Sequence, residues 1–204
     1  MKNIIKTTRK VKDKRSKTSV PTLEYLLEKR DFVGASTLSN FSITDEIEQL
    51  LWKGYCAFHS KDFSNAQEIY ISILSDEYRS IPEETTLYLA CVYLNMHMYI
   101  EAAEAAVDSS ECSLKHRILY HLSQKLKYSP ESIAAYREKL SGSIEDELCK
   151  AAIMYEQCKY QQVCELYKRM FAEDKSRIAL NLYIAMCYFK MVSKSVGTFY
   201  KRTL

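Results

Sequence analysis

The chain has 204 residues, of which 47% are hydrophobic, 4 are Gly and 3 are Pro. So few turn-forming residues argue against a β-sandwich or barrel, and against a doubly wound fold with Gly-rich phosphate loops. The net charge of +3 combines +7 in residues 1–17 with −4 in the remainder. The body is therefore mildly acidic, and the positive total does not indicate a nucleic-acid-binding domain.

Targeting and redox signals are weak. Residues 1–17 contain no apolar run typical of a signal peptide, and the longest uncharged run, 85–100, falls short of the roughly 20 apolar residues of a membrane-spanning helix. Seven Cys are scattered without a CxxC pair, which favours reduced thiols in a cytosolic-type compartment. We therefore expect no membrane insertion and no disulfide framework.

The chain is expected to begin with a disordered basic tail, residues 1–20, because this segment lacks aromatic residues and is rich in Lys, Ser and Thr. Thr22, Asp62 and Ser129 are expected to cap helices, the last followed by Pro130 at the first helical position. Hydrophobic spacing predicts helices at 22–29, 33–40, 45–59, 63–75, 83–96, 99–108, 113–127, 131–140, 143–157, 160–172 and 176–191.

Aromatic residues recur where the second helix of each predicted pair begins. They are separated by 31, 36 and 61 residues, at Phe32, Phe63, Tyr99 and Tyr160. The long interval fits two units if Tyr128 is the missing aromatic. Residues 192–204 lack the turn aromatic and contain Gly197, so we interpret them as the divergent C-terminal tail of an incomplete repeat.

Small residues recur as well. Gly54, Ala90 and Ala151 each lie nine residues before a turn aromatic, and Ala185 follows Ala151 by 34 residues. A period near 34 with these residue types is the tetratricopeptide pattern, in which small residues let paired helices approach closely. Residues 21–191 are therefore predicted to form an all-α, right-handed superhelix of about five and a half antiparallel helix pairs. The structural repeat positions are Trp52, Gly54, Phe58, Phe63, Ala66, Tyr70, Leu89, Ala90, Tyr93, Tyr99, Ala102, Ala151, Tyr160 and Tyr167.

Two blocks are more specific than the repeat pattern. Residues 21–35 (PTLEYLLEKRDFVGA) and 51–59 (LWKGYCAFH) resemble the first two repeats of the tetratricopeptide repeat protein 26 family, also called the intraflagellar transport protein 56 family. Shorter matches extend the resemblance, in the same order, over residues 21–191. The resemblance implies a subunit of intraflagellar transport complex B that supports cargo transport and assembly of cilia and flagella. It implies other complex B subunits as partners, at the cilium or flagellum and basal body, with a cytoplasmic pool.

No catalytic constellation stands out. His116 and His121 are five residues apart, which does not place two metal ligands on one helix face. The acidic groups at 83–84 and 145–147 fall at predicted helix starts, where the helix dipole favours them. We therefore expect no enzyme activity, no cofactor, no metal and no small-molecule substrate.

Chaperone-binding tetratricopeptide domains hold a carboxylate with Lys and Asn on their inner helices. The corresponding residues of this chain cannot do so, and they are Leu51, Tyr55, Leu87, Cys91, Leu148 and Ala152. A clamp-type co-chaperone is thereby rejected.

Two alternative functions stay open. The chain could be a general cytosolic tetratricopeptide adaptor unrelated to cilia, or it could bind nucleic acid through its basic tail. The acidic body argues against the latter, and we expect no nucleic-acid partner. The tail itself could be a solvated segment, a docking arm for an acidic partner, or a targeting signal.

Overall fold

The computed structural model describes residues 21–76 and 80–203, with side chains as far as Ser193. The expected basic tail, residues 1–20, lies outside the described residues. The described part contains helices and no strand. Its helices are α1 (Leu23–Glu28), α2 (Phe32–Ser42), α3 (Glu46–His59), α4 (Phe63–Leu74), α5 (Thr85–Asn95), α6 (Tyr99–Val107), α7 (Ser113–Lys125), α8 (Pro130–Glu138), α9 (Ile144–Glu156), α10 (Tyr160–Glu173) and α11 (Ala179–Thr203).

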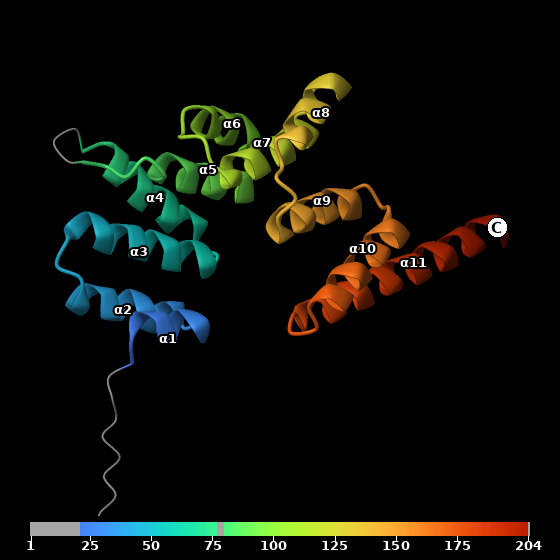
Figure 1. Ribbon diagram of the computed structural model, residues 1–204, viewed down its shortest axis with the longest axis horizontal. Helices are drawn as coiled ribbons and strands as arrows, with labels where there is room; N and C mark the ends of the chain where they lie inside the picture. The colour runs from blue at the N-terminus through green and yellow to red at the C-terminus, as the bar shows by residue number, and fades with distance from the viewer. Residues whose placement is uncertain (1–20, 77–79, 204) are drawn as a thin grey trace, which may run out of the picture.

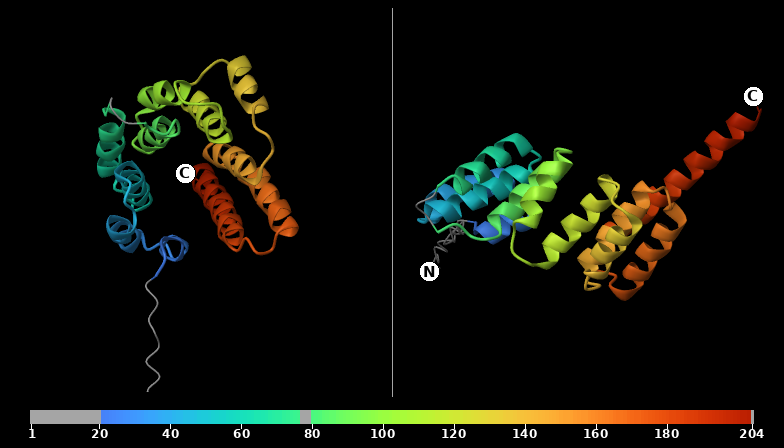
Figure 2. Two further views of the ribbon diagram at one scale, coloured as in Figure 1. Left: turned by 60° about the vertical axis from the view of Figure 1, so that its left-hand side comes forward. Right: turned by 90° about the horizontal axis from the view of Figure 1, so that it is seen from above.

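The first ten helices form five antiparallel pairs, which follow one another along a curved array that ends in α11 (Figures 1 and 2). Within the array each helix packs on its partner, and α2, α4, α6 and α10 also pack on the next helix along the chain. The bounds of these ten helices lie within two residues of those predicted. The all-α repeat architecture expected from the 34-residue period is therefore confirmed.

The last helix differs from its prediction. The expected end at 191 is wrong, because α11 continues to Thr203 without a break at Gly197. A single Gly inside a helix costs only about 1 kcal/mol relative to Ala, so it does not by itself end a helix. The interpretation of residues 192–204 as a divergent tail stays a prediction.

The expected caps are present. Thr22 Oγ1 accepts a hydrogen bond from Tyr25 N at 3.3 Å, and Asp62 Oδ1 accepts one from Asn65 N at 3.3 Å. Ser129 caps α8, with Pro130 at its first position. These side chains satisfy backbone donors that the first turn of a helix leaves without partners.

The turn inside each pair has the same backbone geometry. A non-glycine residue with positive φ, between 55° and 65°, follows each first helix, at Arg30, Lys61, His97, Lys127 and Cys158. Around Lys61, for example, Lys61 N donates to Phe58 O at 3.0 Å and Asp62 N donates to Ala57 O at 2.9 Å. This pair of bonds is the Schellman motif, which normally places Gly at the left-handed residue.

The left-handed residue offers a stabilising substitution. We expect Lys61→Gly to raise the free energy of unfolding by about 1 kcal/mol, because the left-handed conformation costs an L-residue about 1–2 kcal/mol that glycine largely avoids. Urea unfolding followed by circular dichroism measures the change. Ser60→Gly is the matched control, since Ser60 has a helical φ of −78° and glycine should destabilise it. Equal effects of the two substitutions would contradict this account of the turn.

The predicted turn aromatics Phe32, Phe63, Tyr99 and Tyr160 are the first residues of α2, α4, α6 and α10. The proposal that Tyr128 is the missing aromatic is wrong. In the other turns the aromatic lies two residues after the left-handed residue, and in the fourth turn Ser129 holds that place. Tyr128 is 40% exposed.

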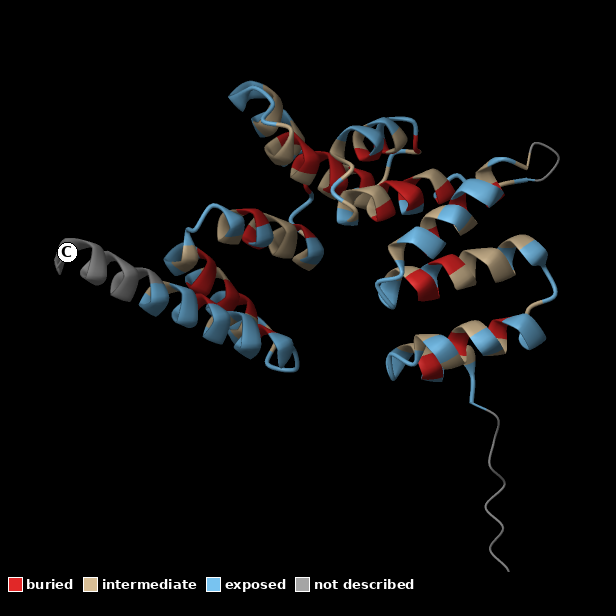
Figure 3. Cartoon of the chain, turned by 180° about the vertical axis from the view of Figure 1, so that it is seen from behind, coloured by how far each residue is buried: buried red, intermediate tan, exposed pale blue. Residues whose placement is uncertain are grey.

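The predicted small positions explain how closely the pairs approach. Ala90 and Ala151 are fully buried, and Gly54 is buried against the ring of Tyr70. In α7 the corresponding residue, seven before the left-handed turn residue, is Tyr120. Tyr120 is much larger than Gly or Ala. The second helix of this pair, α8, has no buried residue and projects from the array (Figures 1 and 3).

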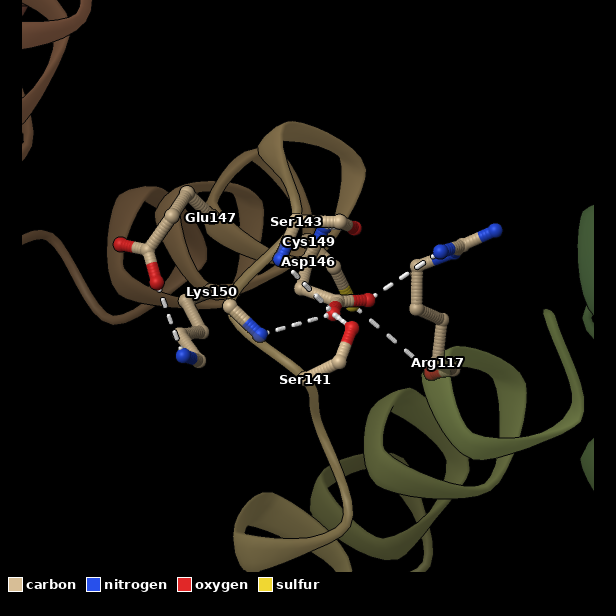
Figure 4. A network of polar contacts seen from close by, with 8 residues as sticks. Arg117, Ser141, Ser143, Asp146, Glu147, Cys149 and Lys150 are labelled. Atoms are coloured by element: carbon tan, nitrogen blue, oxygen red, sulfur yellow. Dashed lines mark hydrogen bonds and ion pairs between the residues drawn. The ribbon is translucent and has the colours of Figure 1, made fainter. Parts of the chain in front are cut away.

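In the other pairs the second helix packs on the next helix of the chain, but in the fourth pair the first helix, α7, makes this contact. Here α9 packs on α7, and a buried ion pair lies between them (Figure 4). Asp146, 1% exposed, accepts a bond from Arg117 Nη1 at 3.1 Å, and its other oxygen accepts bonds from Ser141 Oγ at 2.8 Å, Gly142 N at 3.1 Å and Ser143 N at 3.2 Å. This network ties the last three helices to the preceding part of the array.

Candidate protein-interaction surface

The first helices of the N-terminal pairs, together with α4, form an open apolar depression with a volume of about 420 Å³. We call it the N-terminal pocket. Its lining residues come from α1, α3, α4 and α5, and they are Leu27, Glu48, Leu51, Trp52, Tyr55, Tyr70 and Tyr88. Trp52 is the single Trp of the chain, and its ring packs edge-on to Tyr55 with centroids 5.6 Å apart.

A second depression of about 400 Å³ lies near the other end of the array. We call it the C-terminal pocket. It lies among α9, α10 and α11, and its lining residues are Leu148, Ala152, Tyr155, Glu156, Tyr167, Tyr183 and Met186.

The two pockets are related by the repeat. Leu51 and Tyr55 of one correspond to Leu148 and Ala152 of the other, each pair at the same distance from the small residue of its helix. Each pocket also contains a pair of tyrosines from a second helix and from the next first helix. Tyr70 and Tyr88 have ring centroids 6.0 Å apart at 43°, and Tyr167 and Tyr183 have centroids 5.5 Å apart at 41°. The same packing geometry thus produces an aromatic recess twice.

Burial raises the pKa of the inner tyrosine of each pocket. Burial, followed by neighbouring thiols and phenols, raises the pKa of Tyr70, and burial raises the pKa of Tyr167 to about 12. Both side chains are therefore neutral phenols at physiological pH. The apolar character of the pockets follows from these rings and the adjacent leucines.

The charges beside the two pockets differ. Glu156 of the C-terminal pocket pairs with Lys125 Nζ at 2.9 Å. In the N-terminal pocket, the carboxylate of Glu48 is exposed and makes no hydrogen bond or ion pair with any residue in 21–76 and 80–193. Within the part of the chain that the structure describes, the N-terminal pocket therefore presents a negative charge that no cation pairs with.

Four of the six rejected clamp positions fall at these pockets. Leu51 and Tyr55 line the N-terminal pocket, and Leu148 and Ala152 line the C-terminal pocket, whereas Leu87 is buried in the core. Surfaces that would bind a carboxylate in a clamp-type protein are apolar in this chain. They suit apolar side chains of a protein partner, which is the kind of group that anchors interfaces.

The fourteen predicted repeat positions all lie within the packing. Six are half-buried: Trp52, Phe58, Phe63, Tyr93, Tyr99 and Tyr160. The other eight are buried: Gly54, Ala66, Tyr70, Leu89, Ala90, Ala102, Ala151 and Tyr167. Of the fourteen, Trp52, Tyr70 and Tyr167 line one of these two pockets. The lining residues that sequence reasoning missed are Leu27, Glu48, Tyr88, Tyr155, Glu156, Tyr183 and Met186. Tyr88 and Tyr183 share a signal that sequence reasoning could have used, because each lies two residues before a small repeat position.

The histidines have structural contacts. His59 stacks on Phe32 with centroids 5.2 Å apart, and His116 Nε2 lies 2.8 Å from Glu111 Oε2. Among the described residues no group of three or more His, Cys, Asp or Glu is arranged to hold a metal ion. Within the same residues, none of the helices has the length and apolar character needed to cross a bilayer.

The cysteines differ sharply in environment. Cys158 is exposed, Cys56, Cys164 and Cys187 are buried, and burial raises the pKa of the Cys91 and Cys149 thiols to about 11. Cys112 is half-buried. Because the thiolate is the reactive form and must be accessible, we expect the exposed Cys158 to react with Ellman's reagent well ahead of the other six thiols in the native protein. Cys158→Ser should remove this fast phase, whereas Cys164→Ser should retain it. Persistence of the fast phase without Cys158 would contradict the assignment.

Comparison with known proteins decides the family. The family model described as "Intraflagellar transport protein 56" matches residues 50–200, which is most of the chain. The chain belongs to the intraflagellar transport protein 56 family. A curated relative, the intraflagellar transport protein 56 homolog of Caenorhabditis elegans, is 27% identical over 179 residues. That alignment covers 84% of this chain and 31% of the relative, so the chain spans about a third of its length.

A solved structure supports the fold. The chain is similar to a tetratricopeptide repeat protein from Parabacteroides merdae, with a TM-score of 0.53, 15% identity, and coverage of 86% of this chain and 73% of the other. At that identity the likeness concerns the fold alone. Both the family and the tetratricopeptide architecture predicted from the sequence are thus confirmed.

Proposed function

We propose that the chain is a non-enzymatic protein-interaction scaffold of the intraflagellar transport machinery, acting with complex B subunits in cargo transport and in assembly of cilia and flagella. The observation that carries this proposal is the family match over residues 50–200, on an array of helix pairs that presents two repeat-related apolar pockets. The proposed location is the cilium or flagellum and basal body, with a cytoplasmic pool.

The pockets supply a physical basis for scaffolding. Exposed aromatic side chains lose little conformational entropy on binding and bury a large area, so they serve well as interface anchors. Tyr55, Tyr88 and Tyr183 are each about 40% exposed in the free chain, at 39%, 38% and 40%. A partner segment that covers them removes apolar surface from water, which favours association.

Affinity capture of the tagged full chain from ciliated cells tests the proposal. We expect complex B subunits among the captured proteins, and weaker recovery with Tyr55→Ala or Tyr183→Ala. Glu147→Ala, a half-buried surface residue outside both pockets, is the control and should capture as the parent chain does. Recovery of only non-ciliary partners would instead support a general tetratricopeptide adaptor and overturn the ciliary proposal.

A further inference from the structure

The N-terminal pocket combines an apolar recess with the carboxylate of Glu48, which has no partner among residues 21–76 and 80–193. Its walls are provided by leucines and aromatic rings, while Glu48 is its one charged lining residue. Glu84, at the start of α5, adds negative charge near Tyr88. Burial of the Tyr88 phenol is the largest cause of its raised pKa, and the charge of the Glu84 carboxylate is the second. An occupant must therefore be apolar where it enters the recess and positively charged beside it.

The C-terminal pocket shows that this charge is specific to one site. Its tyrosine pair has nearly the same geometry, but Glu156 is already neutralised by Lys125 at 2.9 Å. The two pockets should therefore share an affinity for apolar side chains and differ in their response to a neighbouring cation. Complementary charge contributes to selectivity and register more than to affinity.

We propose that the N-terminal pocket receives a short segment of a partner protein in which a bulky apolar side chain is followed directly by lysine or arginine. The apolar side chain enters the recess against the exposed rings of Tyr55 and Tyr88, and the cation pairs with Glu48. This inference rests on the proposed scaffold function and specifies the chemistry of one of its binding sites.

Trp52 makes the proposal measurable on the full chain. It is the only Trp in the sequence and it lines the N-terminal pocket, so its fluorescence reports occupancy of that pocket alone. The probes are two synthetic hexapeptides in a glycine–serine frame, one containing leucine followed by arginine and the other leucine followed by glutamate. We expect the arginine peptide to change Trp52 emission with a dissociation constant on the order of 1 mM, as suits a ligand that buries about ten atoms.

The charge contribution is read from the difference between the two peptides. The glutamate peptide should bind about fivefold more weakly, which is the scale of an exposed ion pair. Glu48→Gln, a substitution of an exposed residue, should remove most of this difference, and Glu84 accounts for the remainder. Tyr88→Ala should weaken both peptides, whereas Tyr183→Ala in the C-terminal pocket should leave both titrations unchanged.

Several results would overturn the proposal. These are no change in Trp52 emission with either peptide, equal binding of both peptides, or a peptide preference that Glu48→Gln leaves undiminished. Binding that appears only after Lys6, Lys10 and Lys12 are replaced by glutamate would assign the pocket to the chain's own basic N-terminus instead. Because the probes are synthetic, their failure is distinguishable from a failure to capture complex B subunits.

Discussion

Replacement of Asp146 by alanine is expected to lower the free energy of unfolding by about 3 kcal/mol, because it leaves buried hydrogen-bond donors without an acceptor. Asp146 is 1% exposed, and its oxygens accept bonds from Arg117, Ser141, Gly142 and Ser143. The Arg117 side chain retains 22% exposure, so water compensates part of its loss and keeps the cost at the lower end for a broken buried pair. Urea unfolding followed by circular dichroism at neutral pH measures the change.

Glu147→Ala provides a matched control in the same turn of α9. Glu147 pairs with Lys150 Nζ at 2.8 Å, but both side chains are partly exposed, so its removal should cost less than about 0.5 kcal/mol. Amide hydrogen exchange adds a local readout, since loss of the α7–α9 connection should speed exchange in α9 before α3 and α4. Equal destabilisation by the two substitutions would contradict a special role for Asp146.

The same carboxylate predicts a dependence of stability on pH. Burial alone would raise the pKa of Asp146, but hydrogen bonds from Ser141, Arg117 and Ser143 outweigh it and lower the pKa to about 2. A lowered folded-state pKa means that the stabilisation is fully present above the unfolded value of about 4 and is lost as the pH falls toward 2. The stability gap between the parent chain and Asp146→Ala should therefore narrow between pH 4 and pH 2, by about 2 kcal/mol. A gap that stays constant over this range would rule out the assignment.

The network also shows where sequence reasoning stops. The acidic run at 145–147 correctly indicated a helix start, since Asp146 forms a capping box with Ser143. Its second role depends on Arg117, 29 residues earlier, which comes within reach only because α9 packs on α7. Helix propensity and capping are local and can be read from the chain, whereas this ion pair depends on the placement of two helices that no local pattern determines.

The turns and pockets show the same contrast between features that a local sequence pattern predicts and features that depend on packing between helices. The repeat period located four of the five turns by their aromatic residue and misplaced the fourth at Tyr128. The left-handed residues of the turns are Arg, Lys, His and Cys, with none of the glycine that usually marks that conformation. Tyr70 and Tyr167 were recognised as repeat positions within single helices. The pockets they line require a further tyrosine from the next pair, and the buried Lys115, whose Nζ binds Val107 O at 2.9 Å and Ser109 O at 2.7 Å, likewise depends on packing between pairs.

Gly54→Ala is expected to destabilise the chain by about 1 kcal/mol, although alanine is the better helix former. A Cβ at Gly54 would lie 2.7 Å from Cζ and 2.8 Å from Cε1 of Tyr70, whose ring is only 3% exposed and cannot move freely. Overpacking of this kind typically costs 1–3 kcal/mol, occasionally more, against a gain of about 1 kcal/mol in helix propensity. Urea unfolding measures the net loss, and displacement of Tyr70 should also weaken the peptide-induced change in Trp52 emission.

A double-mutant cycle separates the clash from other effects of the new methyl group. Tyr70→Leu removes the ring atoms that the Cβ would meet, so Gly54→Ala should be neutral or slightly stabilising in that background. The coupling between the two positions would then show that the size of Tyr70 imposes glycine on α3. Because Tyr70 also forms one wall of the N-terminal pocket, the residue that requires glycine for packing is the one that shapes the proposed binding site. An equal cost of Gly54→Ala in both backgrounds would separate the two roles and contradict this coupling.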